Sequence, residues 1–365
     1  MEENIKKFGS LITRLINKKN LSHVEAYEAF RQILLNEQPE IQQGAFLAAL
    51  KAKGETTEEI AGSWEAIYEF DTTKVIPETN SPLVENCGTG MDEIKTFNIS
   101  TAASVIAAAA GIVMAKHGAR AITSVCGTID ILEAIGLDVD CDSLVVKKSI
   151  EEAGIGIFNG MSPKVHPNAL GRILSQISFG TTLNIAASLA NPVMPKFGVR
   201  GVYARELVNP VARVMKEIGY KRAIVIHGLD SDGKSGMDEA STLGVTIISE
   251  LQESGIIKEY SISPEEMGIM RASRDSIAPL NNLKQEASRF VGLLSGKEDG
   301  ACSDIVCLNA AFLLYMMNIA PSIKDGFHQA KDIIKSGRAI NKLKNWVQTQ
   351  QTQAGNGISK LNSFL

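Results

Sequence analysis

The stretch NCGTGMDEIKTFNIST, residues 86–101, decides what fold this chain is expected to have. It joins closely spaced glycines to a row of hydroxyl and amide side chains, and the small, apolar stretch AASVIAAAAGIVMA, residues 102–115, follows directly. Glycine lets backbone N–H groups approach an anion closely, and the start of a helix adds positive potential. The stretch therefore predicts a turn from strand to helix that holds an anionic group. A plain tight turn before a capped helix is the alternative.

A second loop has a similar composition. KHGARAITSVCGTID, residues 116–130, places the cations Lys116 and Arg120 before side chains with hydroxyl groups, among them Ser124 and Thr128. Cations and hydroxyl donors in a loop between a strand and a helix suit phosphate oxygens. The sequence thus predicts two loops that favour phosphate.

A third loop carries adjacent carboxylates. IVIHGLDSDGKSGMDEAST, residues 224–242, runs from an apolar strand into a polar loop that contains Asp238 and Glu239. Neighbouring carboxylates suit Mg²⁺, which prefers oxygen ligands and often shares them with substrate phosphates. Alone, this loop would be interpreted as a solvated acidic turn. With the two phosphate-favouring loops, it indicates a doubly phosphorylated ligand bound together with Mg²⁺.

The organisation along the chain predicts two kinds of domain. TTKVIPETNSPLVEN, residues 72–86, contains two prolines and resembles a linker, and beyond it short apolar runs such as RAIVIHG, residues 222–228, alternate with Gly-rich turns and amphipathic helices. Such alternation predicts an α/β domain with a mainly parallel central sheet. We expect a small all-helical domain over residues 1–75, joined by a returning helical segment near 163–190, and an α/β domain over residues 76–365.

Within the first domain, residues 4–70 are expected to be helical throughout. The pairs Ser22–Glu25 and Thr56–Glu59 have the spacing of capping boxes. Gly54 follows a helical pattern and suits a helix end.

Composition excludes several classes of function. The 365-residue chain has a formal net charge of -4, which argues against a nucleic-acid partner, for which a basic surplus is expected. The five cysteines form no CxxC pair, so we expect a reduced, cytoplasmic setting without a disulfide framework. The start, MEENIKKF, lacks the apolar segment of a signal peptide, and the longest apolar run is shorter than the roughly 20 residues of a spanning helix. No membrane association is expected.

These motifs, in this order, resemble those of the anthranilate phosphoribosyltransferase family, and the likeness covers nearly the whole chain. The family pattern GTGGDxxxTFNIST is matched at residues 88–101, KHGNR at 116–120 and SGSAD at 126–130. The family's Asp-Glu pair is matched at 238–239, and its His-Pro at 166–167. The resemblance implies a fold of the nucleoside phosphorylase and phosphoribosyltransferase type.

The resemblance also implies a reaction. Phosphoribosyl pyrophosphate (PRPP) would lie between the two domains, and an aromatic amine, anthranilate by default, would displace its pyrophosphate without a covalent nucleophile. The residues implied to bind PRPP are Gly88, Thr89, Gly90, Asp92, Thr96, Asn98, Ser100, Thr101, Lys116 and Thr128. Mg²⁺ is implied at Asp238 and Glu239, with Ser100 also near a metal. A homodimer through the helical domain is expected from the family.

Two departures from the family pattern fall in or next to the turn over residues 88–92, which we call the glycine turn. Met91 replaces a glycine, and Glu93 replaces a residue that is often glycine. A Cβ atom restricts φ and narrows the approach of the backbone to phosphate. We expect residues 88–92 still to cradle pyrophosphate through their N–H groups, with Met91 at a negative φ and its side chain pointing away.

Other departures fall where the acceptor would bind, near Ala119, His166, Arg172 and Gln176. Ala119 replaces the asparagine of KHGNR. Counted from His166 without a gap, Gln176 occupies the place of an arginine that faces the anthranilate carboxylate in the family, and Arg172 lies about one helical turn earlier. The acceptor side is therefore expected to be altered, with poor use of anthranilate or a different aromatic or heterocyclic acceptor.

Two further functions stay open at this point. A nucleoside-phosphorylase-like activity would share the architecture, although phosphorolysis needs no divalent metal and leaves the Asp238–Glu239 pair without a role. A non-catalytic relative that binds nucleic acid or another partner would also share it, although the acidic balance argues against this.

Overall fold

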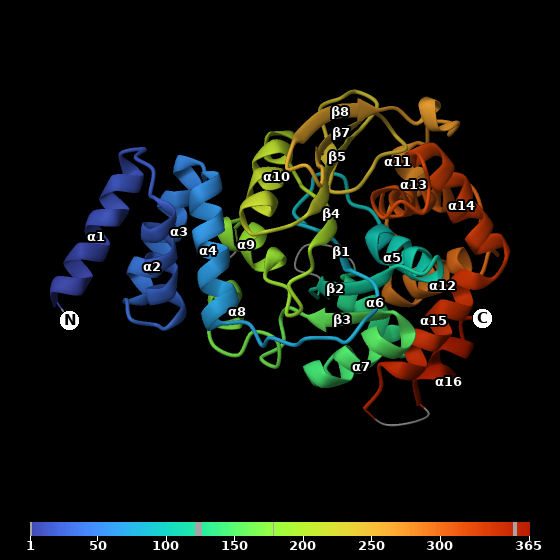
Figure 1. Cartoon of the computed structure of the whole chain (residues 1–365), viewed down its shortest axis with the longest axis horizontal. Coiled ribbons are helices and arrows are strands. Elements are labelled where there is room, and N and C mark those ends of the chain that lie inside the picture. Colours follow the sequence, from blue (N-terminus) through green and yellow to red (C-terminus); the bar gives the residue numbers. More distant parts are fainter. Residues whose placement is uncertain (1, 121–125, 178, 353–355) are drawn as a thin grey trace.

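The computed structural model describes residues 2–120, 126–177, 179–352 and 356–365 (Figure 1). The first elements are α1 (Glu2–Ile16), α2 (His23–Leu34), α3 (Glu40–Lys53) and α4 (Thr57–Phe70). Both predicted capping boxes are present, at Ser22–Glu25 and at Thr56–Glu59. Gly54 ends α3 with a φ of 90°, a conformation that favours glycine. Local turn chemistry therefore predicted this helical module, α1–α4, correctly.

A central sheet follows the helical module. Its strands are β1 (Leu83–Gly88), β2 (Val113–Gly118), β3 (Ile155–Asn159), β4 (Phe197–Gly201), β5 (Arg222–Leu229), β6 (Gly236–Met237), β7 (Thr246–Leu251) and β8 (Ile257–Ile262). The strand order is β3-β2-β1-β4-β5-β7-β8, and β6 pairs with β5. Pairing is parallel from β3 to β5 and antiparallel for β6, β7 and β8. The predicted α/β class with a mainly parallel sheet is confirmed.

The predicted linker is too long at its C-terminal end. Strand β1 begins at Leu83, inside the stretch 72–86, and its buried residues Val84 and Glu85 belong to the sheet. The two prolines of the stretch, Pro77 and Pro82, lie before the strand. The two prolines correctly indicated a connecting segment before β1, but they did not show where that segment ends.

Helices cover both faces of the sheet. They are α5 (Ile99–Ala109), α6 (Thr128–Ala134), α7 (Ser143–Ala153), α8 (Leu170–Gln176), α9 (Thr182–Leu189), α10 (Val208–Glu217), α11 (Arg274–Ile277), α12 (Leu283–Leu294), α13 (Ala301–Met316), α14 (Ile323–Lys335), α15 (Arg338–Thr349) and α16 (Asn356–Asn362), with short 3₁₀ turns at Arg205–Leu207 and Glu265–Met267. In Figure 1, α5 and the C-terminal helices α12–α16 lie on the side of the sheet away from the helical module. Because α5 consists largely of alanine and is buried, it packs closely against the sheet and α13.

Helices α8, α9 and α10 lie between the helical module and the sheet (Figure 1). Buried side chains of all three share one apolar core with those of α1–α4, including Leu170, Ile173 and Leu189. The indole N–H of Trp64 on α4 donates to the carbonyl of Leu189 at 2.9 Å. The chain therefore returns to the helical module at residues 170–189, while the exact domain boundary at residues 75 and 76 stays a prediction.

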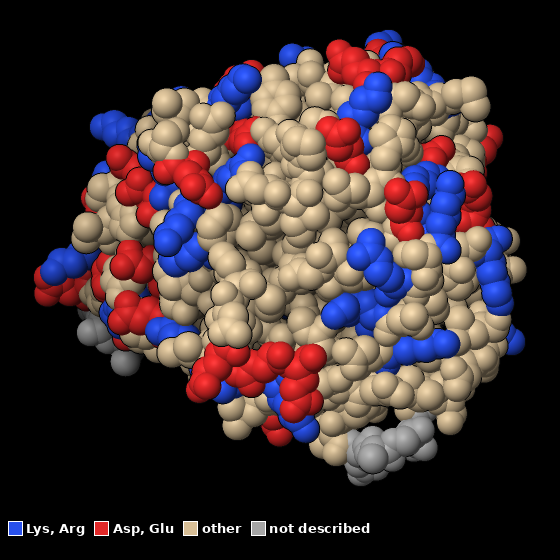
Figure 2. Space-filling model, turned by 45° about the vertical axis from the view of Figure 1, so that its right-hand side comes forward, with Lys and Arg blue, Asp and Glu red and all other residues tan. Residues whose placement is uncertain are grey.

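The charged surface is mixed. Figure 2 shows Lys and Arg in separate groups among acidic groups and uncharged surface. Within the described ranges, no helix is long and apolar enough to span a bilayer.

A buried ion pair lies where the sheet meets the returning helices. Glu85 on β1 and Arg200 on β4 are each 1% exposed, and the Arg200 guanidinium donates to the Glu85 carboxylate at 2.9 Å. Tyr220 and Asn191 donate to the same carboxylate, at 3.0 Å and 3.1 Å. One buried acid therefore connects β1 and β4 with the ends of α9 and α10.

Glu85→Ala is predicted to lower the free energy of unfolding by about 3–5 kcal/mol, because it leaves the Arg200 charge buried without its partner. Urea unfolding followed by circular dichroism would measure the loss. Glu3→Ala is the matched control, since the Glu3–Lys7 pair is exposed and should contribute nothing measurable. Equal losses in the two variants would contradict the prediction.

Candidate active site

A cavity of about 720 Å³ opens at the ends of the central parallel strands. In open α/β sheets, ligands bind at the carboxyl ends of the strands. The cavity is lined by the predicted residues Gly88, Thr89, Gly90, Asp92, Thr96, Asn98, Ser100, Lys116, Ala119, Thr128, Asp238 and Glu239. The structure thus gathers the three predicted loops around one space. The roles of single residues there stay predictions. Ser124 lies outside the described residues.

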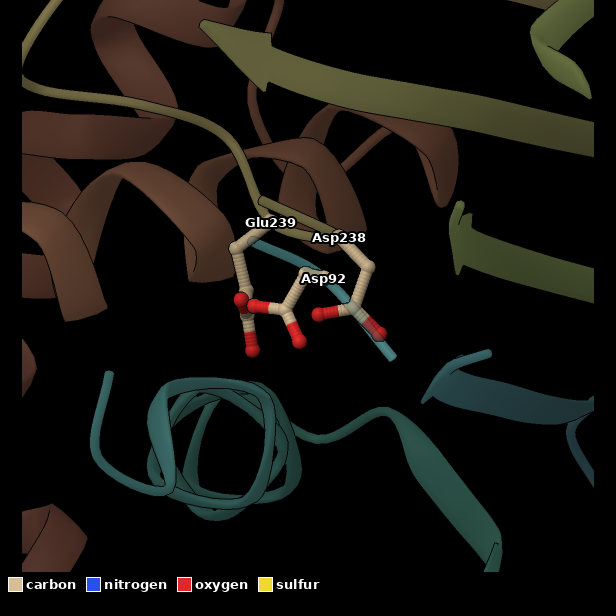
Figure 3. A group of neighbouring side chains, drawn as sticks. All are labelled: Asp92, Asp238 and Glu239. Carbon is tan, nitrogen blue, oxygen red and sulfur yellow. The ribbon is translucent and has the colours of Figure 1, made fainter. Parts of the chain in front are cut away.

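Three carboxylates meet at one edge of this cavity. Asp92, from the loop after β1, joins Asp238 and Glu239, which follow β6, and one oxygen from each lies within 4.8 Å of the others. Figure 3 shows the carboxyl groups gathered together. The Gly90 N–H donates to Asp238 Oδ2 at 2.7 Å and fixes that side chain. The sequence predicted the Asp-Glu pair but assigned Asp92 to PRPP, whereas the structure places it within this acidic trio.

The trio is electrostatically strained. Burial, together with the nearby charge of Asp238, raises the pKa of the Asp92 carboxyl to about 7. Burial and the charges of Asp238 and Asp92 raise the pKa of Glu239 well above its usual range. Glu239 Oε2 is buried and has no hydrogen-bond partner among the described residues. Crowded carboxylates with an unpartnered oxygen fit a divalent cation, and Mg²⁺ prefers such oxygen ligands.

The glycine turn differs from the prediction in two ways. Met91 has a φ of 68°, in the left-handed region, instead of a negative φ. The N–H of Thr89 donates to the Gly201 carbonyl at 3.1 Å, so this group and the Gly90 N–H already have partners within the protein. The predicted cradle of N–H groups over residues 88–92 is therefore incomplete at these two positions. The sequence did not reveal that Asp238 and Gly201 would lie so close.

The start of α5 remains open to a ligand. Asn98 occupies the N-cap position but makes no capping hydrogen bond through its side chain, and its buried Oδ1 has no partner among the described residues. The alternative of a plain capped helix is thus not what the structure contains. Thr101, predicted to bind PRPP, is buried behind the cavity wall, and its hydroxyl pairs with that of Thr128 at 3.2 Å. Its observed contact positions Thr128 at the start of α6.

Lys116 brings a buried amine to the cavity. Its Nζ donates to the Asn86 carbonyl at 2.6 Å and to Ser104 Oγ at 3.1 Å. Burial lowers the pKa of this amine to about 8. An anion in the cavity would favour the charged form.

Comparison with known proteins identifies the family. Models of the glycosyl transferase family match the chain at residues 9–70, for the helical bundle domain, and at 80–340, for the a/b domain. The anthranilate phosphoribosyltransferase of Methanococcoides burtonii is 39% identical over 340 residues, which is 92% of each chain. That of Acetivibrio thermocellus is 37% identical over 92% of this chain and 95% of its own length.

The chain belongs to the anthranilate phosphoribosyltransferase family. It is accordingly a glycosyltransferase of the pentosyltransferase class, as the sequence predicted. The crystal structure of the Thermus thermophilus family member superposes with a TM-score of 0.83 at 31% identity, covering 93% of this chain and 99% of the other. The Saccharomyces cerevisiae member, solved in complex with PRPP and Mg, has the same fold, with a TM-score of 0.83 at 23% identity over 95% of this chain and 99% of that chain.

On the acceptor side, the structure places the family's expected residues elsewhere. The Arg172 guanidinium donates to Gln43 Oε1 and to the Ile33 carbonyl, both at 3.2 Å, so it points into the helical module. Gln176 is exposed and does not line the cavity, whereas its neighbour Ser175 does. Neither predicted side chain reaches the cavity, because α8 turns them away from it.

His166 also lies behind the cavity wall. Its Nδ1 lies 2.5 Å from the Asp71 carbonyl and its Nε2 lies 3.2 Å from His117 Nε2. A carbonyl only accepts, so in the neutral His166 ring Nδ1 carries the proton, and Nε2 faces His117 without one. Burial lowers the pKa of both histidines, which favours this neutral pair. His117, which lines the cavity, was not predicted as a site residue.

The sequence also missed an apolar wall of the cavity. Four side chains that line the cavity, Met161, Leu174, Ile177 and Phe179, form what we call the apolar wall. Leu174 and Ile177 are three residues apart, a helical spacing that could have identified them. The other two follow from no local pattern.

Asp92→Asn is predicted to stabilise the metal-free protein, and increasingly so as pH rises from about 4 to about 7. The unfolded Asp92 loses its proton near 3.8 but the folded one only near 7, so the wild type loses stability between these values. Urea unfolding with a chelator at several pH values would measure the difference.

Asp232→Asn is the control for this series, because Asp232 is an exposed carboxylate of the loop before β6. Its effect on the free energy of unfolding should be small, because exposed surface substitutions usually change stability by less than about 0.5 kcal/mol. A constant difference for Asp92→Asn would contradict the prediction. Added Mg²⁺ should reduce the difference at pH 7 by stabilising the ionised trio.

Proposed function

We propose that this protein catalyses the Mg²⁺-dependent transfer of the phosphoribosyl group of PRPP to an aromatic amine, with anthranilate as the acceptor that its relatives' names indicate. The observation that carries the proposal is the acidic trio at the edge of a cavity that is also lined by Asn98, Ser100 and Lys116. An acidic trio repels a free pyrophosphate unless a cation lies between them. Donors and carboxylates side by side therefore favour a metal–pyrophosphate ligand.

The chemistry requires little of the protein beyond placement and charge. The amine nitrogen forms a bond to C1 of the ribose, the bond from C1 to the pyrophosphate oxygen breaks, and pyrophosphate leaves with the electron pair while the amine loses a proton. Mg²⁺, held by Asp92, Asp238 and Glu239, would neutralise charge on the leaving group. Lys116 and the open start of α5 would orient the phosphates, and the apolar wall would hold the ring near C1 and exclude water.

Asp238→Asn combined with Glu239→Gln is predicted to remove the enhancement of PRPP binding by Mg²⁺ without unfolding the protein. The two changes keep the side-chain shapes but remove the negative charge that holds the cation. Calorimetric titration of PRPP with and without Mg²⁺ measures the effect. Asp232→Asn, in the neighbouring loop but outside the trio, should retain the enhancement.

An unchanged Mg²⁺ dependence in the double variant would contradict the assignment of the metal. Tight PRPP binding that never required Mg²⁺ would instead favour the phosphorylase-like alternative, because phosphorolysis needs no divalent cation. A wild-type protein that binds no PRPP under either condition would favour the non-catalytic alternative.

The acceptor's carboxylate would meet a cavity with few free cations. The described cationic side chains that line the cavity are Lys95, Lys116 and Arg120. Lys95 lies 3.8 Å from Asp92, and Arg120 pairs with Asp130, Glu133 and Asp140. The apolar wall itself carries no charge. We therefore propose that anthranilate is bound mainly through its ring and amine, and weakly through its acid.

Ser175→Arg is predicted to improve the use of anthranilate, because residue 175 lines the cavity beside the apolar wall. A hydrogen bond to a charged group contributes about 1.5–3 kcal/mol, or roughly ten- to a hundredfold in KM. Steady-state turnover with PRPP would measure KM for anthranilate and for aniline, which lacks the acid.

Gln176→Arg is the matched control, since it places the same charge one residue along, on the exposed side of α8. Gln176→Arg should leave KM unchanged for both anthranilate and aniline. Ser175→Arg should leave KM for aniline unchanged. Efficient wild-type turnover at micromolar anthranilate, with no gain in Ser175→Arg, would contradict this account of the acceptor side.

The predicted cytoplasmic location and the homodimer through the helical module belong to the same proposal. The homodimer rests on the resemblance of the chain to its family, and the cytoplasmic location rests on the five cysteines, which form no CxxC pair.

A further inference from the structure

Met91 adopts a backbone conformation that residues with side chains rarely adopt. Its φ is 68°, and Gly90 before it has a φ of 66°. Three of the other non-glycine residues with positive φ among the described residues, Lys18, Asn36 and Asn318, lie two positions beyond the end of a helix, where such a conformation is common. Met91 lies in the turn between β1 and α5, so helix termination does not explain it.

The Met91 side chain has a specific contact. A Cβ atom placed on Gly180 would lie 3.1 Å from Met91 Sδ and 3.4 Å from its Cε, so the end of the thioether rests on that glycine. Gly180 has no positive φ, and its lack of a side chain serves the close approach and not a turn. The side chain of the strained residue Met91 therefore occupies the space that the missing side chain of Gly180 leaves.

This contact crosses the edge of the cavity. Met91 lines the cavity and is 41% exposed, and its neighbours Gly90 and Asp92 belong to the acidic edge. Gly180 follows Phe179 of the apolar wall directly. The thioether therefore lies between the turn that carries Asp92 and the loop that carries Phe179 of the apolar wall.

We propose that Met91 is a specificity-determining residue, whose thioether, seated on Gly180, limits the size of the aromatic ring that can reach C1 of the phosphoribosyl group. The inference rests on the proposed function. It adds that acceptors are restricted to single-ring aromatic amines. A second ring fused to the acceptor would need the space that the thioether fills.

The test compares two acceptors in five proteins. The acceptors are anthranilate and an ortho-aminonaphthoate. The second compound has the same adjacent amine and acid groups, but a second aromatic ring is fused to the ring that carries them. The proteins are the wild type, Met91→Gly, Met91→Leu, Gly180→Ala and the double variant Met91→Gly/Gly180→Ala. Turnover with PRPP and Mg²⁺ gives kcat/KM for each acceptor.

Met91→Gly should raise the ratio of kcat/KM for the naphthoate to that for anthranilate about tenfold or more, the size of effect typical of a hydrophobic pocket. Met91→Leu, which keeps the volume, should keep the wild-type ratio. Gly180→Ala should lower kcat/KM for anthranilate several-fold when Met91 is present, because the new methyl pushes the thioether into the cavity. In the double variant, the alanine should have no such effect.

An unchanged ratio in Met91→Gly would overturn the proposal, and so would a loss from Gly180→Ala that is equal with and without Met91. Fluorescence titration of each acceptor against each variant gives the corresponding ratio of dissociation constants, and this measurement requires no turnover. A wild-type protein that binds anthranilate selectively but never releases pyrophosphate would count against the proposed function alone.

Discussion

The candidate active site depends on the close approach of Asp238 to two glycines. A Cβ on Gly88, at the end of β1, would lie 2.0 Å from Asp238 Oδ2, and one on Gly201, at the end of β4, would lie 1.5 Å from the Asp238 carbonyl oxygen. A side chain at Gly201 would displace the backbone after β6, and one at Gly88 would displace the Asp238 carboxylate. Because both strands end in glycine, the antiparallel part of the sheet brings Asp238 and Glu239 against the parallel part, where Asp92 lies. The electrostatic properties of the site follow from this packing.

The same turn after β1 is joined to elements that pack with the helical module. Lys51 on α3 donates to the Tyr203 hydroxyl at 2.8 Å, and the Tyr203 N–H donates to Thr89 Oγ1 at 3.1 Å. The Met91–Gly180 contact connects the turn to the loop between α8 and α9. A displacement of α3 or of that loop therefore acts directly on residues beside the carboxylates.

Burial acts in opposite directions on the charged groups of the cavity. It raises the pKa values of Asp92 and Glu239 and lowers that of Lys116, so each group is less charged in the empty protein than in water. A bound cation would lower the pKa values of the two carboxyl groups, and a bound polyphosphate would raise that of Lys116. Together they would restore the charged forms of all three groups. This reciprocity favours joint over separate binding of metal and pyrophosphate.

The sequence alone determined the fold class, the helical module and the three loops that surround the cavity, although it assigned the start of β1 to the linker. These follow from local rules, namely hydrophobic periodicity, capping pairs and glycine turns. Only the tertiary structure decided which side chains face the ligand. A helix turns by about 100° per residue, so counting from His166 could not determine that Ser175, and not Gln176 or Arg172, lines the cavity. Nor could the sequence reveal that the Met91 thioether would rest on Gly180, 89 residues away in the chain, because only packing brings the two together.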